Sequence, residues 1–160
     1  MTNSSAETDA WSRTSAPGAH ETGVQRQGWR AYFEATALLQ DRLDRTLKES
    51  AGLHLADYNL LLLLSEAPEG RLRMGELARL MVFSPSRVTY QVKTLEQRGL
   101  VERQPDPRDR RSKIVAPTGA GRELYASAKA AVDLAAERSL GDLRPQDRED
   151  LARLLRQVAF

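Results

Sequence analysis

The segment 74–117 constrains the fold more than any other part of the chain, because its caps and breakers fix where each element can begin and end. The apolar residues of 74–81 recur at helical spacing and predict a short helix. Ser84 and Pro85 follow within a few residues, and they are a favoured N-cap and first helical residue. Gly99 ends the helix that starts there. The buried stripe of this second helix is predicted to be Val88, Val92 and Leu95.

Two short apolar runs, 100–103 and 113–116, follow this helix and read as strands. The segment between them, 104–112, is polar and contains two prolines, so it predicts a loop. Two strands around such a loop form a β-hairpin. A short helix, a tight turn, a capped helix and a hairpin together predict a helix-turn-helix with a wing, in which the second helix enters the major groove of DNA.

The remaining patterns predict a mainly α fold with a small β-wing, an α+β winged helix of six helices and a short hairpin or three-stranded sheet. Residues 1–27 are poor in apolar side chains and read as a flexible tail. We expect the winged helix-turn-helix at 55–118. The flanking helices, in 28–54 and 119–160, carry apolar stripes that the small winged domain cannot cover, which favours a dimer.

Composition excludes several kinds of chemistry. The chain of 160 residues has no cysteine and two histidines, His20 and His54, so we expect no disulfide, no metal site and no cofactor. We find no nucleophile–base pair, phosphate loop or metal motif and expect no enzyme. The N-terminal residues lack a secretory pattern and no apolar run is long enough for a membrane span, so we expect a cytoplasmic protein.

Basic charge is concentrated in one segment. Residues 84–113 hold eight basic and four acidic side chains, whereas the net charge of the whole chain is +2. The face of the second helix opposite its apolar stripe is rich in hydrogen-bond donors, and Arg87 there can make a bidentate contact to guanine. This pattern indicates a surface that faces phosphates and bases. The candidate DNA-contacting residues are Arg73, Ser84, Ser86, Arg87, Thr89, Tyr90, Lys93, Arg108, Arg110 and Arg111.

The arginines of the hairpin predict a wing whose tip can enter the minor groove, where negative potential is enhanced. Asp106 and Asp109 suit a purely phosphate-gripping loop poorly. We expect them to stabilise the wing by pairing with its arginines.

The sequence resembles the MarR (multiple antibiotic resistance regulator) family over about residues 29–160. The resemblance rests on five series of residues: Gly75-Glu76-Leu77-Ala78, Ser84-Pro85-Ser86-Arg87-Val88-Thr89, Leu95-Glu96-Gln97-Arg98-Gly99-Leu100-Val101, Asp106-Pro107-Arg108-Asp109-Arg110-Arg111-Ser112 and Pro117-Thr118-Gly119-Ala120-Gly121. The wing segment is the most specific of them. Pro117 departs from the pattern, since leucine is more frequent there. The resemblance implies an intertwined homodimer that binds a pseudo-palindromic operator and usually represses transcription.

The resemblance also implies a small-molecule effector bound between the dimer helices and the winged lobe. The candidates for such a pocket are Trp29, Tyr32, His54 and Tyr58, with Arg30 beside them. Each has a structural alternative that we favour: the aromatic residues as dimer core, His54 as a cap and Arg30 as surface. The alternative function is an architectural protein with little sequence preference, distinguished by the ratio of specific to non-specific affinity.

Overall fold

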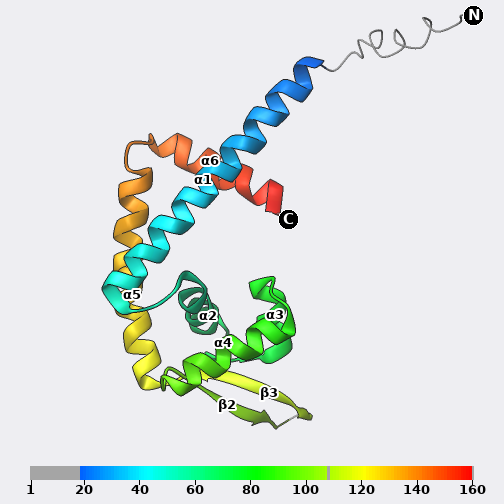
Figure 1. The fold of residues 1–160 in the computed structure, drawn as a ribbon, viewed down its shortest axis with the longest axis vertical. Coiled ribbons are helices and arrows are strands. Elements are labelled where there is room, and N and C mark those ends of the chain that lie inside the picture. The colour runs from blue at the N-terminus through cyan, green and yellow to red at the C-terminus, as the bar shows by residue number, and fades with distance from the viewer. Residues whose placement is uncertain (1–18, 108, 160) are drawn as a thin grey trace, which may run out of the picture. The chain divides into compact units, whose positions relative to one another are not determined.

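The computed structural model describes residues 19–107 and 109–159, without the side chains of residues 19–22, 24, 25, 110, 111 and 159. Two units are distinguished, Met1–Leu38 and Leu39–Phe160, and the boundary between them falls inside helix α1 (Ala19–Ala51). The described residues form six helices and one three-stranded sheet, which confirms the predicted fold class (Figure 1). The other helices are α2 (Leu55–Glu66), α3 (Met74–Met81), α4 (Pro85–Gln97), α5 (Gly119–Leu140) and α6 (Pro145–Ala159). The strands are β1 (Leu72–Arg73), β2 (Val101–Asp106) and β3 (Asp109–Pro117).

The first helix begins earlier than the composition indicated. Residues 19–27, which we placed in the tail, are helical, and residues 1–18 lie outside the described part of the chain. Helical hydrogen bonds form within the segment itself, so a helix can continue where no apolar stripe marks it. The helix stops at Ala51, and Gly52 after it takes the left-handed conformation with φ of 61°.

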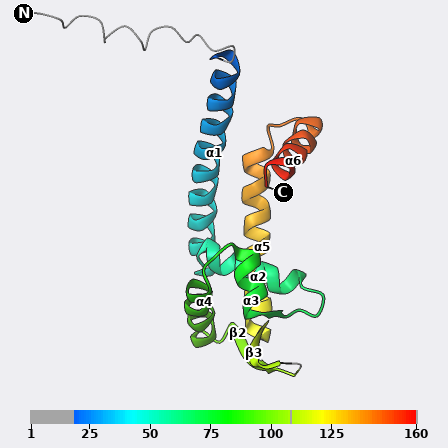
Figure 2. The ribbon, with the colours of Figure 1, turned by 90° about the vertical axis from the view of Figure 1, so that its right-hand side faces the viewer.

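The sheet is antiparallel, with β3 between β1 and β2. Both hairpin strands extend into the segment that we predicted as a loop, and Pro105 lies opposite Lys113 within the ladder. Proline cannot donate a ladder hydrogen bond and is therefore confined to edge strands and irregular positions. Strand β2 is an edge strand, and its register shifts between Pro105 and Asp106. Figures 1 and 2 both show the hairpin projecting beyond α4.

The core of the second unit joins the winged helix to α5. Its centre is α2, where Leu60, Leu61 and Leu64 are buried and Leu62 and Leu63 pack against them half-buried. The stripe predicted for α4 is confirmed, since Val88, Val92 and Leu95 are buried. Helix α3 buries Leu77, Ala78 and Met81 on one face.

The Thr118–Gly121 segment holds the start of α5 against the residues that follow α4. The hydroxyl of Thr118 donates to the carbonyl of Gly99 at 2.6 Å and accepts from the backbone N–H of Gly121 at 3.0 Å. A Cβ on Gly121 would lie 1.9 Å from the carbonyl oxygen of Leu100. Only glycine allows this approach, which gives the motif Thr-x-x-Gly a structural cause. Among the described residues, no helix has the length and apolarity that crossing a membrane requires.

Candidate nucleic-acid interface

The turn between α3 and α4 is a Schellman motif with an unusual residue at its left-handed position. The N–H of Val82 donates to the carbonyl of Arg79 at 3.2 Å, and that of Phe83 donates to the carbonyl of Ala78 at 3.1 Å. Val82 has φ of 55°, a conformation in which glycine is usual and a β-branched residue is strained. Because helix α3 ends this sharply, α4 can start after only three intervening residues.

Helix α4 begins as the sequence predicted. The side-chain oxygen of Ser84 accepts from the backbone N–H of Arg87 at 3.3 Å, and Pro85 is the first helical residue. The Ser86 hydroxyl lies 3.2 Å from that of Ser84. Two exposed hydroxyls therefore lie at the positive end of this helix, which is a favourable place for a phosphate.

The outward face of α4 carries the predicted polar residues. Ser86, Arg87, Thr89, Tyr90 and Lys93 are all exposed, and Tyr90 is 74% exposed. The hydroxyl of Thr89 donates to the carbonyl of Pro85 at 2.8 Å, so a lone pair rather than the proton remains for a partner. The face is continuous, polar and free of large aliphatic side chains.

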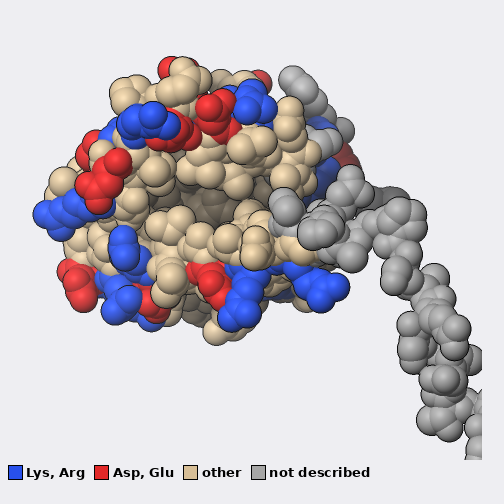
Figure 3. Space-filling model, turned by 90° about the horizontal axis from the view of Figure 1, so that it is seen from above, with Lys and Arg blue, Asp and Glu red and all other residues tan. Residues whose placement is uncertain are grey.

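Arg87 and Lys93 on this face differ from many other basic side chains of the described surface in their lack of an acidic partner. Among the described residues, no carboxylate lies within ion-pair distance of Arg87 or Lys93. By contrast, Arg103 pairs with Glu96, and Lys129 pairs with Asp133 at 2.6 Å. On the face shown in Figure 3, basic and acidic side chains likewise lie close to one another. The exposed face of α4 therefore keeps its positive charge available for an external anion.

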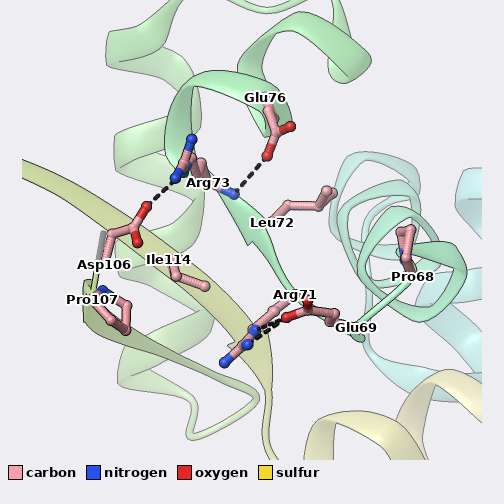
Figure 4. Close-up of a pocket in the computed structure, with 9 residues that line it drawn as sticks. All are labelled: Pro68, Glu69, Arg71, Leu72, Arg73, Glu76, Asp106, Pro107 and Ile114. Atoms are coloured by element: carbon pink, nitrogen blue, oxygen red, sulfur yellow. Dashed lines mark hydrogen bonds and ion pairs between the residues drawn. The ribbon is translucent and has the colours of Figure 1, made fainter. Parts of the chain in front are cut away.

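Asp106, predicted to stabilise the wing, is paired with Arg73. The Nε of Arg73 donates to Oδ2 of Asp106 at 2.5 Å, and the Asp106 side chain is 2% exposed (Figure 4). The backbone N–H of Arg73 also donates to Oε2 of Glu76, which caps α3, at 3.3 Å. Arg73 thus joins the wing to the start of α3, although we selected it as a DNA contact. A cavity of about 300 Å³ lies beside this pair, lined by Pro68, Glu69, Arg71, Leu72, Arg73, Glu76, Asp106, Pro107 and Ile114.

The tip of the wing lies partly outside the described residues. This applies to Arg108 and to the side chains of Arg110 and Arg111, all predicted DNA contacts. The backbone of Arg110 and Arg111 belongs to β3, and Asp109, the other predicted wing-stabilising residue, is exposed at its start. The backbone of Arg110 and Arg111 therefore lies near the start of β3 in the hairpin.

Sequence reasoning missed the contacts that hold α4 against α2. Asp57 is buried, and its Oδ1 accepts from Nε2 of Gln91 on α4 at 3.3 Å. Arg98, which follows α4, places Nη1 3.7 Å from Oδ2 of Asp57 and donates from Nη2 to the carbonyl of Gly52 at 3.0 Å. Gln91 is a polar residue on the buried side of the helix, and periodicity alone gives no signal for its partner. This network orients α4 from its inner side.

The residues predicted for an effector pocket occupy different environments. In the first unit, Trp29 and Tyr32 are exposed and their rings stack with a centroid distance of 5.9 Å. In the second unit, His54 is exposed at the start of α2, with Nδ1 3.4 Å from Oδ1 of Asp44. Tyr58 is buried in the core, beside Tyr125 with a centroid distance of 5.6 Å. Burial, followed by the neighbouring Tyr125, raises the pKa of Tyr58 to about 12. None of the four lines the cavity beside the wing.

Known proteins with this arrangement were found by family and by structure. Residues 51–112 match the family model described as MarR family. A MarR family transcriptional regulator from Streptomyces coelicolor, solved in complex with DNA, is 36% identical, with 84% of this chain and 85% of that chain covered and a TM-score of 0.79. AbsC, another such regulator from the same organism, is 31% identical over 85% of this chain and 92% of that chain, with a TM-score of 0.79.

CouR from Rhodococcus jostii, solved bound to p-coumaroyl-CoA, is 33% identical over 79% of this chain and 87% of that chain, with a TM-score of 0.71. A search of curated proteins gave no match. These likenesses extend over most of the chain and agree with the helix-turn-helix and wing described above. The chain belongs to the MarR family of transcriptional regulators.

Proposed function

We propose that this protein is a non-enzymatic repressor that acts in the cytoplasm and binds a specific double-stranded DNA operator as a homodimer. The observation that carries the proposal is the exposed face of α4, where Arg87 and Lys93 have no carboxylate partner among the described residues. A regulator of known structure with 36% identity was solved in complex with DNA, which supports DNA binding by this chain.

In this proposal, Arg87 makes a bidentate contact to a guanine in the major groove, since its fork of donors matches the two acceptors of that base. Ser84 and Ser86 bind a phosphate at the start of α4, and Thr89, Tyr90 and Lys93 contact base edges or neighbouring phosphates. Arg108, Arg110 and Arg111 contact the DNA from the wing, and one of them enters the minor groove. Arg73 contributes by its pair with Asp106 and by its exposed surface.

The homodimer is supported by apolar side chains that the helices of each unit leave exposed. In the first unit, α1 exposes an aromatic cluster in which Trp29 is 60% exposed. In the second unit, α6 exposes Leu154, Leu155 and Val158. Large apolar patches on a protein surface mark contacts with a partner. A dimer formed through the terminal helices would present two α4 helices to half-sites roughly 10 base pairs apart.

We further propose that a small-molecule effector releases the DNA. The support is the relative CouR, solved bound to p-coumaroyl-CoA. Trp29, Tyr32, His54 and Tyr58 remain the candidate residues. Thermal-shift screening of aromatic acids and their thioesters tests this proposal: a ligand that raises the melting temperature and weakens operator binding supports it. A ligand that binds without changing DNA affinity contradicts it.

The main test is selection of duplexes from a random pool, followed by fluorescence anisotropy at near-physiological salt. We expect a short inverted repeat bound by one dimer at least about 10³-fold more tightly than a scrambled duplex. Equal affinity for both duplexes would instead identify an architectural DNA-binding protein. Absence of binding to either duplex would refute DNA recognition by this face.

Two variants assign the contacts. Arg87→Ala should relax the preference at one base pair at a cost of about 1–3 kcal/mol, whereas equal weakening on all sequences would place Arg87 on a phosphate. Replacing both Arg110 and Arg111 with Ala should flatten the salt dependence by up to about two phosphate equivalents. An unchanged slope would show that the wing does not touch DNA.

A further inference from the structure

Phe83, the last residue of the turn before Ser84, is a half-buried aromatic residue beside the outward face of α4. The Schellman hydrogen bond from its N–H to Ala78 fixes its backbone, and its side chain packs against the buried core of the winged helix. The ring is therefore supported from the inner side. A ring held in this way can act as a rigid platform for a neighbouring side chain.

The guanidinium of Arg87 lies over the face of the Phe83 ring. Its Cζ lies 3.6 Å from the centroid of the Phe83 ring, well within the range of a cation–π contact. A guanidinium over an aromatic face keeps its N–H groups available for a planar acceptor, because the ring engages its face and accepts no conventional hydrogen bond from them. The ring thus holds the Arg87 side chain without consuming the donors that a guanine requires.

We infer that Phe83 is a positioning residue that holds Arg87 ready for base recognition. The inference rests on the proposed function, in which Arg87 reads a base. A long side chain that is already ordered loses less conformational entropy on binding, which corresponds to about a 3- to 10-fold gain in specific affinity. Binding to scrambled DNA gains less from this ordering, because contacts to phosphates do not require Arg87 to reach one particular base edge. Phe83 therefore acts on specificity more than on general DNA affinity.

The test compares Phe83→Leu, which keeps an apolar side chain but removes the ring, with Phe83→Tyr, which keeps the ring. Binding is measured to the selected operator, to operators altered at single base pairs, and to scrambled DNA. We expect Phe83→Leu to bind the operator about 3- to 10-fold more weakly and to discriminate less at the base pair read by Arg87. Scrambled DNA should be bound as by the wild type, and Phe83→Tyr should keep the wild-type preference.

Two controls separate positioning from general damage. Met74→Ala removes another half-buried residue that packs on the same core, and it should lower stability without changing base preference. In an Arg87→Ala background, Phe83→Leu should have no further effect on discrimination, since the group that it positions is gone. If Phe83→Leu does not fold, nuclear magnetic resonance of the wild-type protein still tests the contact, because the ring should shift the Arg87 Hδ resonances upfield.

The outcomes distinguish the two proposals. If Arg87→Ala changes no base preference, base reading by Arg87 fails, and the role of Phe83 fails with it. If Arg87→Ala relaxes one position but Phe83→Leu leaves that position unchanged, only the inference about Phe83 is wrong. Equal effects of Phe83→Leu in the wild-type and Arg87→Ala backgrounds, or Arg87 Hδ resonances at unperturbed positions, would also overturn it.

Discussion

The pair between Arg73 and Asp106 gives the sharpest prediction about stability. It joins β1, at the start of α3, to the end of β2, two segments separated by 33 residues in the sequence. Asp106 is 2% exposed and Arg73 is 45% exposed, so the carboxylate has little access to water as a substitute partner. Arg73→Ala should therefore destabilise the winged helix even in the absence of DNA.

The size of the effect follows from this unequal burial. Exposed ion pairs contribute about 0.2–1 kcal/mol, and breaking a buried pair costs about 3–5 kcal/mol. Solvent screens the half-exposed arginine, which brings the expected cost of Arg73→Ala to about 1.5–3 kcal/mol, the range for hydrogen bonds to charged groups. At about 2–4 °C for each kcal/mol, the melting temperature should fall by roughly 3–12 °C.

Thermal and urea unfolding at one fixed protein concentration measure the cost, since dimerisation makes stability depend on concentration. A double-mutant cycle with Asp106→Asn isolates the contribution of the pair. Lys129→Ala, which breaks the exposed pair with Asp133 on α5, is the matched control and should change the melting temperature less. A fall for Arg73→Ala no larger than that of the control would refute the reasoning. So would additivity of the two substitutions in the cycle.

Three further predictions concern single positions. Gly121→Ala should lower the free energy of unfolding in urea by about 2–3 kcal/mol, because its Cβ would lie 1.9 Å from the backbone carbonyl oxygen of Leu100. Wild-type stability of this variant would show that α5 can shift. Val82→Gly should raise the free energy of unfolding by roughly 0.5–1 kcal/mol, because it relieves the strain of the left-handed backbone and removes a side chain that is 89% exposed. A lower free energy of unfolding would contradict this. Tyr58 should ionise near pH 12, so the folded state loses stability as the pH rises above 10, where tyrosine in the unfolded chain ionises. Absorbance at 295 nm should show a late step that disappears in Tyr58→Phe, and an unchanged titration in that variant would refute the assignment.

The candidate interface was predictable where its signals are local. Ser84 and Pro85 predicted the start of α4, and the spacing of its apolar residues predicted which face is buried. The outward face, with Arg87 and Lys93, follows from these two facts without any knowledge of the rest of the fold. The contacts that orient α4 were not predictable. Gln91 and Asp57 are 34 residues apart, and neither pattern nor spacing relates them.

In the wing, too, local features were predictable from the sequence and long-range contacts were not. Its arginines and its two strands were recognisable, but the strands continue through Pro105 because β2 lies at the sheet edge, a position that the strand sequence does not state. Arg73 was selected for its charge as a DNA contact, whereas its described partner is Asp106.

The sequence by itself therefore determined the order of the helices and hairpin strands, the cap of α4, the family and the polar face of α4, because each depends on residues within a few positions of one another. Only the tertiary structure decided how Arg73 and Asp106 join the wing to α3, why Gly121 has to be glycine, and that Phe83 lies beneath Arg87. The first two depend on segments brought together by burial of the core. The third depends on a turn that directs Phe83 back toward the helix that follows it.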